Sequence, residues 1–177
     1  MRLPTIVCYT GGTAGDIISK IVDPSELSPD RQKLKKPHLF QSVEEKDQYI
    51  ISSSWASLPS HDFEYHRLRQ HKILGIQCRE MQSALWAASR FKEIHRPHVW
   101  EEMCRACGAN TIEQYAQMII DFGNMIAGYT SDVIYLDRII AGNAIEDLEL
   151  LGLPVPGAEL YKEWLNSNEK MHNTNPR

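Results

Sequence analysis

The sequence predicts an α/β protein with an open, mostly parallel sheet and helices on both faces, in three layers. Short apolar runs, typical of strands that are buried on both sides, recur along its 177 residues. Segments with a helical spacing of apolar residues stand between these runs. Strands separated by helices pair in parallel, because each must be reached through a crossover.

The first apolar run, residues 3–9, is the candidate for the central strand, and it ends at Gly11 and Gly12. A helical stripe of isoleucines and valine follows over 14–22. Pro24, two residues later, prevents the helix from continuing. The chain therefore opens with a strand, a glycine-rich turn and a short helix.

Residues 24–37 are polar and basic, and we expect them to run over the surface as a solvated face or as a local basic patch. Apolar runs after this segment predict three more strands, at 48–55, 72–78 and 133–136. Helical spacing predicts helices at about 81–91, 98–107, 111–126, 143–151 and 157–166. We expect one domain over 1–167 and a frayed polar tail over 168–177.

Length and composition indicate which partners and which cellular compartment to expect. A chain of this length buries roughly two thirds of the surface that it exposes when unfolded, so it needs no disulfide or metal to fold. The net charge of -4 gives no general attraction to polyanions, and a DNA partner would need a local basic patch. The cysteines are few, which favours a reducing compartment, and no run reaches the roughly 20 apolar residues that cross a bilayer. We expect a cytoplasmic protein without a membrane partner.

The turn after the first strand has the features of a phosphate-binding site. Backbone N–H groups at a helix start have no helical partner, and the helix dipole adds positive charge there. Glycines let the chain approach an anion closely and adopt positive φ. The predicted phosphate-binding residues are Gly11, Gly12, Thr13, Ala14 and Gly15. The alternative is a tight turn that binds no ligand.

The turn departs from the P-loop pattern of Gly, four residues, Gly-Lys and Ser or Thr. Thr10 stands at the first glycine, Asp16 at the lysine and Ile17 at the hydroxyl residue. Asp16 could cap the helix, hold Mg²⁺, or accept a proton from an attacking hydroxyl as a catalytic base. The candidates for the missing positive charge are Lys20, Arg79, Arg90 and the basic segment around Lys35.

Two further side chains suit a site at the ends of the strands. His61 lies in a polar loop, and its ordinary pKa of about 6.5 suits catalytic proton transfer; the alternative is a role in loop packing. Arg79 follows a predicted strand and could bind a phosphate through two N–H groups, or pair with Glu80. The polar stretch 95–98 is expected as a solvated connection between helices, with nucleic-acid contact as the alternative.

Two other patterns each allow a binding role and a structural one. Cys104 and Cys107 have half the spacing of a zinc knuckle, but they also suit two helix cysteines one turn apart. Trp86, Phe91 and Trp100 could stack on a base, although the spacing of the first two fits a helix core better.

Several segments together resemble the sulfotransferase-like branch of the P-loop transferases, which includes small phage-encoded members. The turn 9–15 is similar to the loop that binds the 5′-phosphosulfate group, without its usual lysine. Ser60-His61-Asp62 resembles the family's histidine segment, and Cys78-Arg79-Glu80 with Ser83 resembles its 3′-phosphate site. Residues 135–138 and 150–154 resemble its tyrosine-aspartate strand and its leucine-glycine-leucine-proline turn.

The loop and the chain length also resemble P-loop kinases that phosphorylate 5-hydroxymethyluracil in phage DNA. These resemblances imply a P-loop NTPase-like fold in a transferase that uses ATP with Mg²⁺. The phosphoryl group would pass to a hydroxyl of a nucleotide or of a hydroxymethylated pyrimidine base in DNA. Asp16 and His61 would be catalytic, Asp16 would also bind the metal, and Arg79 would bind the nucleotide.

Two alternatives stay open. The first is a sulfotransferase-like enzyme that uses 3′-phosphoadenosine 5′-phosphosulfate. The second is a non-catalytic binding protein that retains a P-loop-like scaffold, which the altered motif permits.

Overall fold

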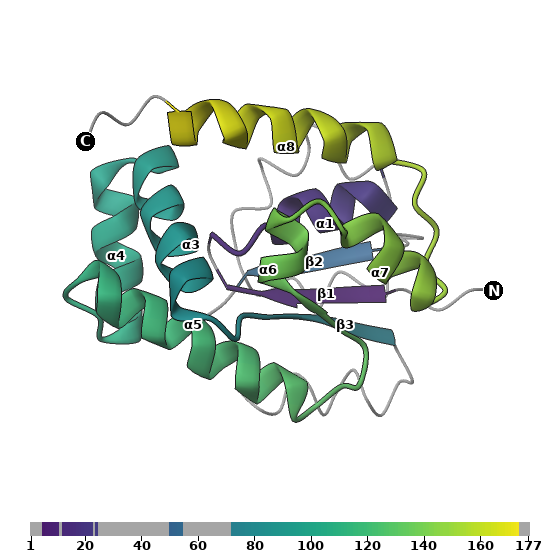
Figure 1. The fold of residues 1–177 in the computed structure, drawn as a ribbon. Helices are drawn as coiled ribbons and strands as arrows, with labels where there is room; N and C mark the ends of the chain where they lie inside the picture. Colours follow the sequence, from purple (N-terminus) through teal and green to yellow (C-terminus); the bar gives the residue numbers. More distant parts are fainter. Residues whose placement is uncertain (1–4, 11, 23, 25–49, 55–71, 174–177) are drawn as a thin grey trace.

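The computed structural model describes residues 5–10, 12–22, 24, 50–54 and 72–173 (Figure 1). Gly11, His61 and most of the basic segment 24–37 lie outside the described residues. Among the described helices, none has the length and apolar character needed to span a membrane.

The described strands form one parallel sheet in the order β2-β1-β3-β4. The strands are β1 (Thr5–Tyr9), β2 (Ile50–Ser54), β3 (Lys72–Gln77) and β4 (Val133–Tyr135). Strand β1 lies inside the sheet, between β2 and β3, so Cys8 is opposite Ser53 on one side and Gly75 on the other. The predicted open parallel sheet and the interior position of its first strand are confirmed.

The described helices cover both faces of this sheet. They are α1 (Gly15–Val22), α3 (Met81–Ile94), α4 (Pro97–Cys107), α5 (Ile112–Ala127), α6 (Leu136–Ile140), α7 (Ala144–Leu150) and α8 (Ala158–Asn173). Helices α1 and α8 lie on one side of the sheet and α5 lies on the other (Figure 1). The protein is therefore an α/β protein with helices on both faces.

Helix α5 packs directly on β3 because glycines stand at the contact. A Cβ on Gly75 would lie 2.3 Å from the side chain of Ile126 in α5. From the other side, a Cβ on Gly123 of α5 would lie 3.1 Å from the backbone nitrogen of Cys78. Larger residues at these positions would push α5 away from the end of β3, where the candidate site begins.

Two boundaries differ from the prediction. The fourth strand ends at Tyr135, and Leu136 starts the short helix α6, which at five residues is too short to show a helical period. Helix α8 continues to Asn173, so much of the predicted tail is helical. Asn168 is buried there and accepts a hydrogen bond from Arg90 Nε at 3.0 Å, which ties this part of α8 to α3.

Candidate functional site

The candidate site lies at the carboxyl edge of the sheet, where β1 and β3 are neighbours. The next strand after β1 lies on one side of this pair, and the next strand after β3 lies on the other. In open α/β sheets, ligands bind outside the carboxyl ends of the strands at such a switch point. The turn over residues 10–15 follows β1, and Arg79 follows β3. Both sequence predictions therefore fall at this edge.

The sign of φ alternates along the turn. Gly12 has a φ of 94° and Ala14 a φ of 64°, whereas the φ angles of Thr13 and Gly15 are not positive. A left-handed residue followed by a right-handed one, here Ala14 and then Gly15 at the start of α1, directs successive N–H groups into one concavity, the arrangement that binds anions in P-loops. Ala14 is the sole described non-glycine residue with positive φ, a conformation that costs roughly 1–2 kcal/mol.

The two threonines hold the turn from inside. Thr13 donates from its backbone N–H and from its hydroxyl to the carbonyl of Thr10, at 3.1 and 2.7 Å. Both threonines are buried, so these donors serve the turn itself. The first helical bond of α1 runs from Ile18 N–H to the Ala14 carbonyl, at 3.2 Å. The N–H groups of residues 15–17 precede it and are the donors that helix geometry leaves for an anion.

Tyr9 and Asp16 close the other end of the turn. The Tyr9 hydroxyl donates to Asp16 Oδ1 at 2.6 Å, and its ring lies against Gly15. Asp16 is exposed in the first turn of α1, where the helix dipole favours a negative charge. The sequence predicted a site role for Asp16 but not for Tyr9, because a tyrosine at the end of an apolar run is typical of an ordinary strand.

Helix α3 brings two ionisable groups near Asp16. Burial lowers the pKa of the Arg90 guanidinium, and the Asp16 carboxylate opposes this shift. Burial likewise lowers the pKa of His95, again opposed by Asp16. The His95 ring packs edge-on against Phe91, with the ring centroids 4.2 Å apart. Arg90 is thus a described candidate for the missing lysine charge that interacts electrostatically with Asp16. The sequence left the choice of cation open and treated His95 as solvated.

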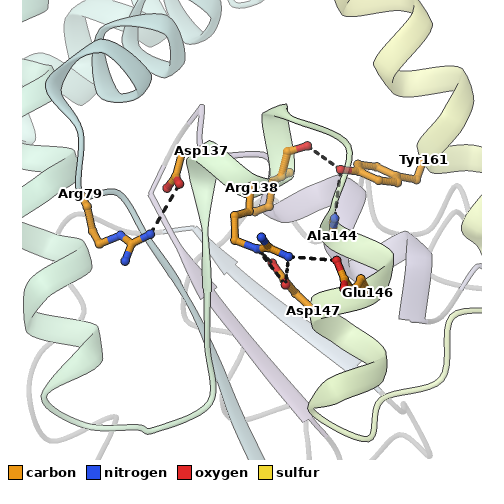
Figure 2. A network of polar contacts seen from close by, with 8 residues as sticks. Arg79, Asp137, Arg138, Ala144, Glu146, Asp147 and Tyr161 are labelled. Carbon is orange, nitrogen blue, oxygen red and sulfur yellow. Dashed lines mark hydrogen bonds and ion pairs between the residues drawn. The ribbon is translucent and has the colours of Figure 1, made fainter.

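Arg79 belongs to a different cluster, at the ends of β3 and β4. Its Nη2 atom lies 3.5 Å from Asp137 Oδ2 (Figure 2). Its guanidinium carbon lies 3.6 Å from the centroid of the Tyr135 ring. The predicted alternative partner, Glu80, makes no ion pair with it among the described residues. About half of the Arg79 side chain is exposed. Arg79 is therefore oriented by two neighbours while keeping donors accessible to a ligand.

Asp137 carries the one buried side-chain oxygen without a hydrogen-bond partner in the described part of the chain, Oδ1. The other arginine of this region, Arg138, is held in place by α7. Its Nε donates to both carboxylate oxygens of Asp147, at 2.9 and 2.8 Å, and its Nη2 lies 3.1 Å from Glu146 (Figure 2). Arg138 thus joins α6 to α7.

The residues of the two remaining patterns lie on α3 and α4. Cys104 and Cys107 lie one turn apart at the end of α4, and the described residues contain no group of three or more His, Cys, Asp or Glu that could hold a metal ion. Phe91 is buried and stacks on Tyr115, and Trp86 packs against Trp164 of α8. The core interpretation of Phe91 and Trp86 is confirmed.

Comparisons of this chain with protein-family models, with curated proteins and with solved structures found no match.

Proposed function

We propose that this protein is a P-loop-type phosphotransferase. In this proposal it moves the terminal phosphoryl group of ATP to a hydroxyl of a nucleotide or of a hydroxymethylated pyrimidine base in DNA. The observation that carries the proposal is the alternating backbone of residues 12–15 between an interior strand and the start of α1. The choice of acceptor follows the resemblance to kinases of 5-hydroxymethyluracil in DNA.

The donors at the turn fit a phosphate group. Backbone N–H groups at the start of α1 donate to its oxygens, and the helix dipole stabilises its charge. A Cβ on Gly12 would lie 2.3 Å from the Ala87 carbonyl of α3, so the turn is held rigidly against that helix. Rigid donors favour phosphoryl transfer, in which catalysis is mostly positioning and electrostatic stabilisation.

Asp16 suits Mg²⁺ as a partner. Magnesium keeps several waters and binds through one or two carboxylates and the substrate's phosphates, so one exposed carboxylate beside the turn is enough. When bound, the ion neutralises part of the phosphate charge. The Tyr9 hydroxyl bonds to Oδ1 and thereby fixes the orientation of the carboxylate. In the same proposal His61 assists proton transfer.

Two measurements test the proposal. The first is the thermal stability of the protein with ATP and Mg²⁺, with adenosine alone, and with adenosine 3′,5′-bisphosphate. A ligand at about 100 times its dissociation constant adds about 2.7 kcal/mol of stability, so ATP is expected to raise the melting temperature and adenosine is not. The second is transfer of label from the γ-phosphate of ATP to DNA that contains hydroxymethyluracil, with thymine DNA as the control.

Asp16→Asn is expected to abolish transfer while leaving the fold intact, and Asp121→Asn, an exposed carboxylate on α5, serves as the matched control. No stabilisation by ATP at millimolar concentration, together with no transfer to DNA or to free nucleotides, would refute the proposal and leave a non-catalytic scaffold.

One observation favours the second candidate, a 3′-phosphoadenosine 5′-phosphosulfate-dependent sulfotransferase. Arg79 is oriented by Asp137 and Tyr135 next to the strand that leads into the turn, as a second phosphate-binding arginine would be. This candidate predicts that adenosine 3′,5′-bisphosphate stabilises the protein more than ATP does. An equal or smaller effect of the bisphosphate rejects it.

A further inference from the structure

We propose that Arg90 supplies the positive charge that the turn lacks, and that its Nη groups bind the outer phosphates of a nucleotide held there. This inference rests on the proposed function, because it assigns a residue to the same site. It concerns a side chain on α3, outside the strand-turn-helix segment that suggested the site.

The first support is the position of Arg90 on α3. A Cβ on Gly12 would lie 2.3 Å from the Ala87 carbonyl and 3.1 Å from Phe91 Cβ, so this part of α3 lies against the turn. Residues three and four apart share one face of a helix. Arg90 is three positions after Ala87 and adjacent to Phe91, so it flanks the surface that contacts the turn.

The second support is how Arg90 is held. Its Nε donates to Asn168 Oδ1 at 3.0 Å, and its guanidinium carbon lies 5.5 Å from the Trp86 ring centroid and 5.2 Å from that of Trp164. These contacts fix the plane of the guanidinium from α3 and α8. Its Nη groups make no hydrogen bond or ion pair with any residue that the structure describes. Within the described part of the chain, the side chain is thus oriented through Nε and the faces of the guanidinium, and its Nη donors are not used.

The third support is electrostatic. A partly buried positive charge is stabilised by an opposite charge and by acceptors for its N–H donors, and a phosphate supplies both. Asp16 opposes the effect of burial on the pKa of Arg90, so the guanidinium and the first turn of α1 share one electrostatic environment. A planar guanidinium also binds phosphate oxygens in pairs, which suits it to replace a lysine at such a site.

A purely structural role accounts for less of this arrangement. A link between α3 and α8 needs the Nε bond to Asn168 and the contacts with the two tryptophans. It makes no use of the Nη donors, which pair with none of the residues that the structure describes. The two roles also differ in what they predict, since only phosphate binding makes the effect of Arg90 depend on the number of phosphates.

The test compares the affinities of AMP, ADP and ATP, with Mg²⁺, by isothermal titration calorimetry. In the wild type, affinity is expected to rise with each phosphate. Arg90→Gln is expected to weaken ATP binding roughly tenfold to a hundredfold, the range of a charge-assisted hydrogen bond, and to weaken AMP binding much less. Arg90→Met removes the same charge but keeps an apolar chain between the tryptophans. Arg105 is an exposed arginine on α4 and provides the control. The Arg105→Gln protein is expected to bind all three nucleotides as the wild type does.

A second measurement uses the unaltered protein, so it holds even where both Arg90 variants fail to fold. ATP is expected to protect Arg90, but not Arg105, from modification by phenylglyoxal, as read by mass spectrometry. Equal loss of affinity for AMP and ATP in the variants, or no protection of Arg90 by bound ATP, overturns the inference and leaves the proposed function standing. Absence of ATP binding by the wild type instead overturns both.

Discussion

Among single residues, Gly15 offers the most direct test of how the turn is packed. A Cβ there would lie 2.0 Å from Tyr9 Cγ, so Gly15→Ala must displace the Tyr9 ring and its hydrogen bond to Asp16. Overpacking of this kind typically costs 1–3 kcal/mol, and we expect urea denaturation to show a loss of about 2 kcal/mol in the free energy of unfolding.

Gly108→Ala is the control for that substitution. Gly108 has a φ of 71°, and a Cβ added there would meet none of the described residues beyond its chain neighbours within 4 Å. Alanine at this position therefore costs only backbone strain, about 1 kcal/mol. A Gly15→Ala protein at least as stable as the Gly108→Ala protein would show that the Tyr9 ring does not depend on the glycine.

Single residues also show what the sequence could and could not predict about the site. The glycines and Asp16 were visible, because a glycine-rich turn after an apolar run has a known backbone use. Arg90 was one of several candidate cations, since only the packing of α3 against Gly12 distinguishes it from the others. The positive φ of Ala14 was not predictable, because alanine seldom adopts this conformation.

At the scale of elements, Tyr161 of α8 joins two short helices. Its hydroxyl donates to the Ile139 carbonyl at the end of α6 and accepts from Ala144 N–H at the start of α7, at 3.2 Å (Figure 2). Tyr161→Phe leaves both buried backbone groups without this partner, so we expect unfolding free energy to fall by roughly 1–3 kcal/mol in urea denaturation.

Tyr135→Phe is the matched control for Tyr161→Phe, because the contact of Tyr135 with Arg79 uses the ring face and not the hydroxyl. Its stability is expected to stay within about 0.5 kcal/mol of the wild type. Equal effects of the two substitutions would mean that the Tyr161 hydroxyl does not hold α6 and α7 together.

Whether the boundaries of a helix could be predicted depended on what stabilises that helix. Long amphipathic segments such as α5 were predicted closely, because a helix with one buried face has apolar residues at a regular helical spacing. Helix α6 and the end of α8 were missed, since each is stabilised by a few specific contacts, Tyr161 for the first and the pairing of Asn168 with Arg90 for the second. Such contacts join residues far apart in sequence and leave no local period.

At the scale of the whole molecule, the parallel sheet was predictable and its strand order was not. Helical crossovers between apolar runs require parallel pairing, and a strand that is apolar on both faces belongs inside the sheet. The side of β1 on which β2 lies depends instead on long-range packing, here of α1 against both β1 and β2. That order is what creates the switch point beside the glycine turn.

The buried thiols of this sheet make the stability of the whole protein sensitive to alkali. Burial raises the pKa of Cys8 from 9.0 to about 12, and burial is also the main cause that raises the pKa of Cys78 to about 11. Above pH 9 the unfolded chain releases these protons and the folded protein retains them, so the unfolded state gains stability. The free energy of unfolding is therefore expected to fall as pH rises from about 9 towards 12, by up to about 1.4 kcal/mol per pH unit for each thiol.

Cys8→Ala tests this assignment through the slope of stability against pH. The substitution removes one titrating group, so its urea-derived stability is expected to fall less steeply between pH 9 and 11 than that of the wild type. Loss of packing at β1 lowers the whole curve by a constant amount and leaves its slope unchanged, which separates the two effects. Parallel curves for wild type and Cys8→Ala would place the alkaline sensitivity in other groups whose pKa values burial raises, namely Cys78, Tyr115 and Tyr161.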